Sequence, residues 1–270
     1  MKRIVFLLLL SCNLAVYAGI GNPHLGARSA ALGHASVTLR DVWSLHNNQA
    51  GLGFLKKVAA GAYYENRFNL SEMSLRGAVF AVPTKAGTFG LNVQQFGFSA
   101  YNETKYGLAY ARKFGDNFSA GIQLNYMTVR VQAEEYGNRN LISAELGFQA
   151  NITEKLKVGA HVFNPTTTEL DDYDNERLPT IMRVGLQYDF SEKVMAFAEV
   201  EKDVDRPAHV KLAVEYQVID LIHLRAGIST NPFRNSFGFG LNLKGLSLDI
   251  ASTYHEILGY TPQVGLSYQF

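Results

Sequence analysis

From about residue 58 to its last residue, the chain alternates between apolar side chains and small or polar ones. Residues 120–126, which read A-G-I-Q-L-N-Y, are a clear example. Successive side chains of an extended strand point to opposite faces, so the alternation predicts strands with one apolar and one polar face. About fourteen such segments follow one another, at roughly 15 residues for each strand and its turn.

This spacing suits strands of about 9–11 residues that cross a membrane and are joined by short turns. Charged residues make up only 18% of the chain, below the roughly 25% of a soluble domain. After the N-terminus, no apolar run approaches the ~18–20 residues of a membrane helix, so any membrane crossing must use strands. We therefore predict an all-β fold, a transmembrane antiparallel β-barrel of about 14 strands, with about 12 as the lower bound.

Connections between the segments alternate between tight turns and longer loops, as expected when turns and loops lie on opposite sides of a membrane. An even number of strands then predicts that both termini lie in the periplasm. The tight set is 84–87, 115–117, 153–155, 191–193, 218–220 and 244–245; the longer set is 100–104, 133–140, 164–178, 202–207, 231–235 and 256–261.

A soluble β-sandwich, whose strands also alternate, is the main alternative fold. Against it, the polar faces carry mostly Gly, Ser, Asn and Gln, and aromatic residues gather near strand ends, where a membrane interface needs them. The chain also ends in an aromatic strand similar to the assembly signal of outer-membrane barrels, with Tyr268 and Phe270 as the signal residues. The predicted partners are therefore outer-membrane lipids and the barrel-assembly machinery.

Residues 1–18 have the features of a signal peptide. A charged Lys2-Arg3 pair precedes the apolar stretch 4–10, and the small residues before Gly19 suit cleavage at that point. The alternative is a lipobox that ends in a lipidated Cys12. Both interpretations predict export, with the bacterial outer membrane as the destination.

Residues 19–57 do not alternate and are rich in Gly, Ala and Ser. The wall side chains of a fourteen-strand barrel cannot fill its lumen, so we predict that this segment plugs it, between the signal peptide and a barrel formed by residues 58–270. Arg28 would then need a carboxylate partner, unless it is solvated in the periplasm. Strand parity predicts these lumen-facing polar residues, of which the acidic ones are the candidate partners: Glu145, His161, Arg183, Glu199, Glu215, Arg225 and Asp249.

The same segment contains four stretches that stand out together: Gly26-Ala27-Arg28, Ala31-Leu32-Gly33, Asp41 and Asn48-Gln49-Ala50-Gly51-Leu52. This pattern resembles the N-terminal signature of the PorV/PorQ group, part of the wider fold family of FadL-type fatty acid transporters. The resemblance implies a fourteen-strand barrel with an N-terminal hatch. It also implies an accessory role in an outer-membrane protein machine, the type IX secretion system, with other outer-membrane or periplasmic proteins of a secretion or assembly complex as partners. Gln49 stands where the family usually has Pro, which implies a looser turn. The predicted plug motif is Gly26, Arg28, Gly33, Asp41, Asn47, Asn48 and Gly51.

Sequence motifs for catalysis are absent: the chain has no HExxH, GxSxG or P-loop pattern, and its single Cys excludes a cysteine metal cluster. Ser143 and His161 share the lumen side of neighbouring strands, but a lumen-lining histidine is the simpler interpretation. The net charge of +1 gives no sign of a nucleic-acid partner. We therefore predict a protein that is not an enzyme and has no cofactor.

Loop 164–178 carries clustered carboxylates, which suit either calcium binding or a solvated surface loop. The first rival function is a FadL-like transporter of hydrophobic small molecules. The short loops and polar lumen faces of this chain argue against a lipid conduit without excluding one. The second rival is a structural or barrel-assembly accessory protein.

Overall fold

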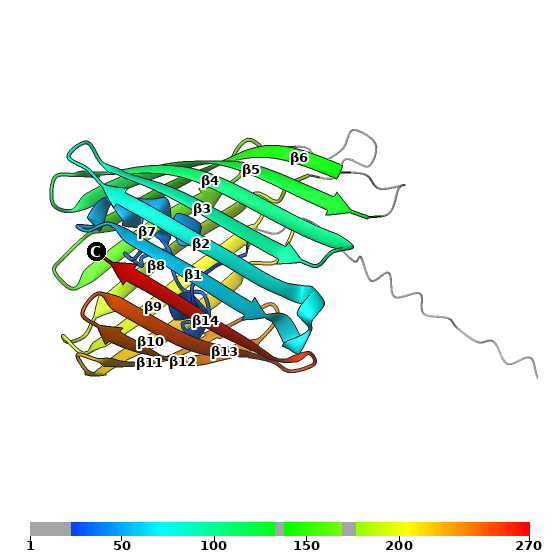
Figure 1. The fold of residues 1–270 in the computed structure, drawn as a ribbon. Helices are drawn as coiled ribbons and strands as arrows, with labels where there is room; N and C mark the ends of the chain where they lie inside the picture. The colour runs from blue at the N-terminus through cyan, green and yellow to red at the C-terminus, as the bar shows by residue number, and fades with distance from the viewer. Residues whose placement is uncertain (1–22, 133–137, 169–176) are drawn as a thin grey trace, which may run out of the picture.

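The computed structural model describes residues 23–132, 138–168 and 177–270, so the predicted signal peptide, Cys12 and all five carboxylates of loop 164–178 lie outside the described residues. Fourteen antiparallel strands form a closed barrel in which β1 pairs with both β2 and β14, as predicted (Figure 1). The strands are β1 Ala59–Asn66, β2 Ser74–Pro83, β3 Thr88–Gly97, β4 Tyr101–Phe114, β5 Phe118–Val131, β6 Asn138–Asn151, β7 Leu156–Phe163, β8 Ile181–Asp189, β9 Val194–Asp203, β10 His209–Ile219, β11 Ile222–Ser229, β12 Arg234–Leu243, β13 Leu246–His255 and β14 Gly259–Gln269.

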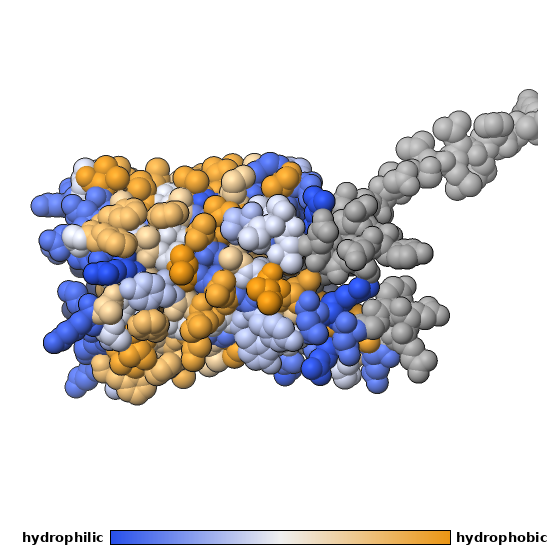
Figure 2. Space-filling view, turned by 90° about the horizontal axis from the view of Figure 1, so that it is seen from above, coloured by the Kyte–Doolittle hydropathy of each residue, from blue (hydrophilic) through white to orange (hydrophobic). Residues whose placement is uncertain are grey.

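The outer face of the barrel is apolar and the inner face is polar, as the period of two requires. On β5, Ile122 and Leu124 are 53% and 60% exposed on the outside, whereas Gln123 and Asn125 between and beside them are buried inside. Figure 2 shows hydrophobic side chains over the middle of the wall and hydrophilic ones towards both ends. An apolar belt between two polar rims is the surface of a barrel that spans a membrane.

Aromatic pairs lie near the tight-turn end of the barrel. The rings of Phe114 and Phe118 are 6.0 Å apart across the β4–β5 turn, and those of Tyr268 and Phe270 are 4.9 Å apart at the end of the chain. Amphipathic and aromatic rings are favoured at the membrane interface, which marks this end as one rim of the belt.

Several predicted long loops are shorter in the structure. Gly97 pairs with Asn102, so β4 already begins at Tyr101 and the loop predicted over 100–104 covers only residues 98–100. Likewise, residues predicted to lie in the loops 202–207, 231–235 and 256–261 are partly in β9, β12 and β14. These predictions were wrong because backbone pairing continues past the point where the apolar alternation ends. The β1–β2 connection, absent from both predicted sets, contains the 3₁₀ turns η2 (Arg67–Asn69) and η3 (Ser71–Met73).

The two ends of the described chain lie at opposite ends of the barrel. The Phe270 backbone N–H donates to the Val58 carbonyl (2.9 Å), at the end with the tight turns. Pro23 lies near Glu65 and Arg67, at the end with the longer connections. The N-terminus itself lies outside the described residues, so the periplasmic location of both termini stays a prediction.

Inside the barrel lie two short helices, α1 (Ala27–Ala31) and α2 (Ser44–Asn47), and the 3₁₀ helix η1 (Gln49–Phe54). Their apolar side chains form the main core of the molecule against small wall residues such as Ala81, Ala109 and Ala251. The Trp43 ring packs edge-on against that of Tyr63, with centroids 5.9 Å apart. No helix in the described ranges is long and apolar enough to cross a membrane.

Candidate functional site

We call residues 23–57 the lumen segment, because they run through the inside of the barrel (Figure 1). The segment begins at the end with the longer connections, where His24 contacts Glu201 of β9. Helix α1 then packs against β11–β14, and η1 packs against β4–β6 before the chain enters β1. Almost every residue from 25 to 52 is buried inside the barrel.

Arg28 on α1 is held by two carboxylates. Its Nε and Nη2 donate to Glu215 of β10 (2.9 and 3.0 Å), and its Nη1 donates to Asp41 (3.3 Å). Burial alone would lower the pKa of Arg28, but Glu215 and Asp41 outweigh it and raise that pKa above its ordinary value. Of the four predicted partners, the barrel brings only Glu215 into contact with Arg28. The pair ties α1 to the wall through a charge-assisted, two-bond contact.

Glu215 belongs to a row of charges along the wall. Arg225 of β11 donates to Glu215 (2.6 Å) and to Asp249 of β13 (2.6 Å). Glu215 therefore serves both the wall and the lumen segment, whereas Asp249 contacts only Arg225 in the wall. Substitution of Glu215 should therefore affect the lumen segment, whereas substitution of Asp249 should affect only the wall.

Glu199 of β9 holds the turn after α1. Its Oε2 accepts the backbone N–H groups of Ser36 and Val37 (2.7 and 2.8 Å), and its Oε1 accepts a hydrogen bond from Lys211 (2.9 Å). Buried backbone N–H groups need such partners, since each one left unpaired costs roughly 1–3 kcal/mol.

Asn48 and Gln49 dock the second half of the segment. Asn48 Nδ2 donates to the carbonyls of Val37, Phe148 and Ala160 at 2.7–3.2 Å. Gln49 Nε2 donates to Glu145 of β6 (2.8 Å), and Gln49 is fully buried. At the position where the family usually has Pro, the amide uses its donor on a wall carboxylate, which a Pro could not do.

Glycines of the wall make room for the segment. A Cβ at Gly147 would overlap Asn48 Oδ1, and a Cβ at Gly227 would overlap the backbone of Leu32. The segment's own Gly26 has φ +104°, a conformation that favours glycine, and a Cβ there would lie 2.9 Å from Trp43. The segment and the inner wall therefore fit each other at backbone distance.

The structure also shows where the remaining predicted lumen and plug residues lie. All seven lumen-facing candidates are buried inside the barrel, and Arg183 Nη1 donates to the Asn47 carbonyl (3.3 Å). His161 contacts Glu145 (2.9 Å), while Ser143 contacts Asn125 and Met127, so the described residues give no sign of a Ser143–His161 pair. The register between β6 and β7 explains why the two side chains do not meet, because His161 lies opposite Gly147. Of the rest of the plug motif, Gly33 packs against the backbone of β11 and Gly51 against Ser44.

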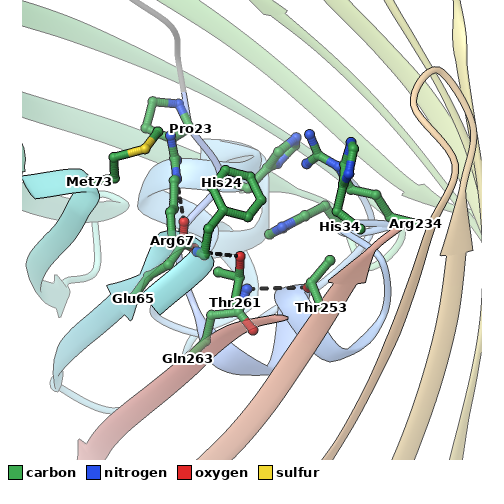
Figure 3. A pocket seen from close by; sticks show the side chains of 12 residues that line it. Pro23, His24, His34, Glu65, Arg67, Met73, Arg234, Thr253, Thr261 and Gln263 are labelled. Atoms are coloured by element: carbon green, nitrogen blue, oxygen red, sulfur yellow. Dashed lines mark hydrogen bonds and ion pairs between the residues drawn. The ribbon is translucent and has the colours of Figure 1, made fainter. Parts of the chain in front are cut away.

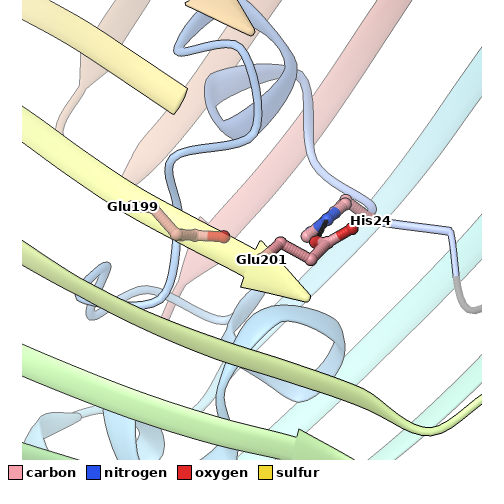
Figure 4. Close-up of side chains that lie close together, drawn as sticks. All are labelled: His24, Glu199 and Glu201. Carbon is pink, nitrogen blue, oxygen red and sulfur yellow. Dashed lines mark hydrogen bonds and ion pairs between the residues drawn. The ribbon is translucent and has the colours of Figure 1, made fainter. Parts of the chain in front are cut away.

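The sequence pattern gave no sign of Lys211, the cation at the centre of an acidic cluster. Lys211 Nζ lies 2.9 Å from Glu199, 2.8 Å from Glu201 and 3.2 Å from His24 Nε2 (Figure 4 shows the other three side chains). The ligand atoms of His24, Glu199 and Glu201 lie within 4.8 Å of one another, a spacing that could hold a metal ion. The ammonium group of Lys211 already occupies that position, so the cluster is an internal ion-pair network.

Two cavities flank α1. The mouth cavity, of about 280 Å³, lies at the end with the longer connections (Figure 3), and the base cavity, of about 330 Å³, lies at the other end. The mouth cavity is lined by Pro23, His24, His34, Glu65, Arg67, Phe68, Met73, Arg234, Thr253, His255, Thr261 and Gln263. The base cavity is lined by Arg28, Arg40, Asp41, Val42, Trp43, Met195, Glu215, His223, Arg225, Asn242, Ser247, Asp249, Ser267 and Gln269.

Helix α1 separates these cavities. On β13, Thr253 lines the mouth cavity and Asp249 the base cavity, while Ala251 between them packs in the same core cluster as α1. On β14, Gly265 lies between the two sets of lining residues and closely approaches Ala27 of α1. None of the described residues lines both cavities. A short helix therefore lies between two polar spaces.

The histidines of the lumen segment are neutral at pH 7. Burial, with the nearby Lys211 and Arg234, lowers the pKa of His34 to about 3. Burial, followed by Arg183 and Lys211, also lowers the pKa of His24. The two rings stack with their centroids 4.9 Å apart. Protonation of either ring would add a charge to a buried stack beside cations.

A third hollow lies on the outer surface, over β2–β6. It has a volume of about 770 Å³ and is lined mainly by outward apolar side chains such as Phe80, Leu91 and Leu124. Its position within the apolar belt means that membrane lipid would cover it.

Comparisons with known proteins concern the fold. No family model matches the chain, and no curated protein matches it. Among solved structures, it is similar to the toluene transporter TodX of P. putida (12% identity, 91% of this chain and 98% of that one, TM-score 0.71). It is also similar to the toluene transporter TbuX of Ralstonia pickettii (12%, 91% and 98%, 0.70) and to a Pseudomonas aeruginosa FadL homologue (13%, 92% and 99%, 0.66).

At these identities the likeness establishes the fold, a FadL-type barrel. It gives no support to the narrower resemblance to the PorV/PorQ group. The matched proteins are described as transporters and channels.

Proposed function

We propose that this protein is an outer-membrane transporter of small organic molecules, gated by its lumen segment. The observation that carries the proposal is the arrangement of two cavities on either side of α1, a barrier only five residues long. The FadL-type fold supports the same function, because solved proteins with this fold are described as toluene transporters. Helix α1 leaves the path when its ion pair with the wall is broken.

The size and lining of the two cavities limit which solutes the transporter could carry. Pockets for drug-sized ligands measure about 300–1,000 Å³, so spaces of about 280 and 330 Å³ suit small solutes rather than long acyl chains. Both cavities are lined by charged and amide side chains, unlike a path for pure hydrocarbon. The predicted substrates are therefore small molecules with a polar group.

The surface of the barrel supports an outer-membrane location and the predicted partners. The apolar belt suits contact with outer-membrane lipids, and the terminal Tyr268 and Phe270, which are exposed at one rim, suit recognition by the barrel-assembly machinery. Export through cleavage before Gly19 belongs to the same proposal.

Planar bilayers test the transport function. The mature chain is expected to be nearly silent, and a variant that lacks residues 19–47 is expected to form steady channels, because the deletion removes α1 and α2. Uptake of a small solute into proteoliposomes should rise in parallel. Large stable conductance from the intact chain would mean an open porin, and silence from the deletion variant would mean that the lumen segment is not the barrier.

An accessory role in a secretion machine is the second candidate, and one observation favours it. The lumen segment is fixed by many directed contacts, including Arg28–Glu215 and the three bonds of Asn48, as a permanent stopper would be. This role predicts that gently solubilised protein is recovered in a stable complex with other outer-membrane or periplasmic proteins. It also predicts that proteoliposomes take up no solute under any condition in which the segment is intact.

A further inference from the structure

The mouth cavity contains a guanidinium group without a counter-ion. Arg234, at the start of β12, points to the inside with Ser236 and lines the cavity beside His34 (Figure 3). Its Nε is buried and has no hydrogen-bond partner, and no carboxylate pairs with Arg234 among the residues that the structure describes. A buried N–H donor without a partner is costly, so an arginine whose Nε is kept in this state at the edge of a cavity points to a partner from outside the chain.

The charges of the lining do not balance. Two guanidinium groups, Arg67 and Arg234, face one carboxylate, Glu65. Arg67 already forms an ion pair with Glu65, whose other oxygen accepts a hydrogen bond from Tyr63 (2.6 Å). Both oxygens of Glu65 are therefore committed elsewhere, and the guanidinium groups of the lining outnumber its carboxylates by one.

Apolar and aromatic side chains line another part of the cavity. Phe68 and Met73 lie over the cavity in the β1–β2 connection, and the Phe68 ring contacts that of His255 edge-on, with centroids 6.1 Å apart. Phe68 has φ +55°, which is rare for a bulky side chain, and its backbone N–H donates to Thr261 Oγ1 (3.1 Å). Strained residues of this kind gather at ligand sites, where the surrounding structure holds them in place.

We propose that the mouth cavity binds a small organic acid, with Arg234 donating to its carboxylate and Phe68 and Met73 packing against its apolar body. A guanidinium group matches a carboxylate through two parallel N–H···O bonds, and one negative charge completes the balance of the cavity. A volume of about 280 Å³ admits a ring or a short chain but excludes a long-chain fatty acid. This inference rests on the proposed transport function and names its substrate class.

Benzoate and benzyl alcohol are matched probes, since they share a ring and differ in the charge. Binding to the detergent-solubilised mature chain is measured by titration calorimetry at constant ionic strength. We expect benzoate to bind at least about tenfold more tightly than benzyl alcohol, the lower range for a charge-assisted hydrogen bond. Arg234→Gln should reduce benzoate affinity by at least about tenfold and leave benzyl alcohol unchanged, and Arg234→Lys should retain part of the preference.

The control variant is Arg130→Gln, which removes an exposed arginine at the end of β5 and should leave both affinities unchanged. Heat-modifiable migration on gels verifies that each variant is a folded barrel. Equal affinity of the wild-type chain for the two probes would overturn the proposal even if Arg234→Gln failed to fold. Unchanged benzoate affinity in folded Arg234→Gln would overturn it as well.

Equilibrium binding separates this proposal from the transport function. Charge-selective binding by Arg234 without uptake into proteoliposomes would refute transport and support the site. Uptake combined with equal binding of the two probes would support transport and refute the site.

Discussion

Glu215→Gln should release α1 from the barrel wall. The substitution removes the charge that holds Arg28 through two bonds of 2.9 and 3.0 Å, and leaves Arg28 with Asp41 alone. Breaking a buried ion pair from one side costs about 3–5 kcal/mol. Because Arg28 is partly exposed and keeps Asp41, we expect the closed state to lose about 2–3 kcal/mol of stability relative to the open state. This loss corresponds to a roughly 30- to 150-fold increase in the open population.

A single cysteine on α1 reports this opening. Ala30 is fully buried in the closed state, and the mature chain predicted from the sequence has no other cysteine, so Ala30→Cys gives one reporter thiol. We expect its labelling by a maleimide to accelerate by roughly 30- to 150-fold when Glu215→Gln is added. Conductance in planar bilayers should rise in the same preparation.

Asp249→Asn is the matched control. Asp249 bonds the same Arg225 as Glu215 does (2.6 Å), but among the described residues it forms no ion pair with the lumen segment. Its loss removes one buried charge without freeing α1. Labelling that stays within about twofold in Glu215→Gln, or that accelerates equally in Asp249→Asn, would refute the role of the ion pair as the latch.

Three further changes test other parts of the structure. Gly147→Ala should destabilise the barrel, since the new Cβ overlaps Asn48; urea unfolding followed by gel migration measures it, and wild-type stability would contradict the close fit. Acidification from pH 7 to 5 should favour opening, because His34 stays neutral with a pKa of about 3 in the closed state but takes a proton near pH 6.5 once released. The closed state then loses up to about 2 kcal/mol at pH 5, and His34→Gln should flatten the pH dependence of conductance. Phe270→Asp should impair membrane assembly more than Gln269→Asp, measured by outer-membrane fractionation, and equal assembly of the two would argue against Phe270 as the signal.

Strand parity predicted much of the fold from the sequence. An alternation with a period of two predicts which side of the wall each residue faces. The count of fourteen strands and the inward side of residues such as Glu215 were therefore predicted directly. Strand parity does not predict which residues contact each other across the lumen. Four carboxylates were possible partners of Arg28, and only the closure of the sheet, with its fixed stagger, brings Glu215 to α1.

The mouth cavity could not be predicted for the same reason. It combines Arg234 of β12, Glu65 of β1 and Gln263 of β14 with His24 of the lumen segment, residues that no linear pattern connects. Loop lengths were also poorly predicted, because backbone pairing at the mouth continues through polar residues such as Asn102.

Backbone-close packing between the inner wall and the lumen segment has an evolutionary consequence. Gly147 faces Asn48, and Gly227 faces Leu32, with no space for even one methyl group. A larger residue on either side can be accepted only together with a smaller one opposite. Among related barrels, these wall positions and their facing positions in the segment should therefore change in pairs, and a barrel that has lost the segment should be free to replace its inward glycines.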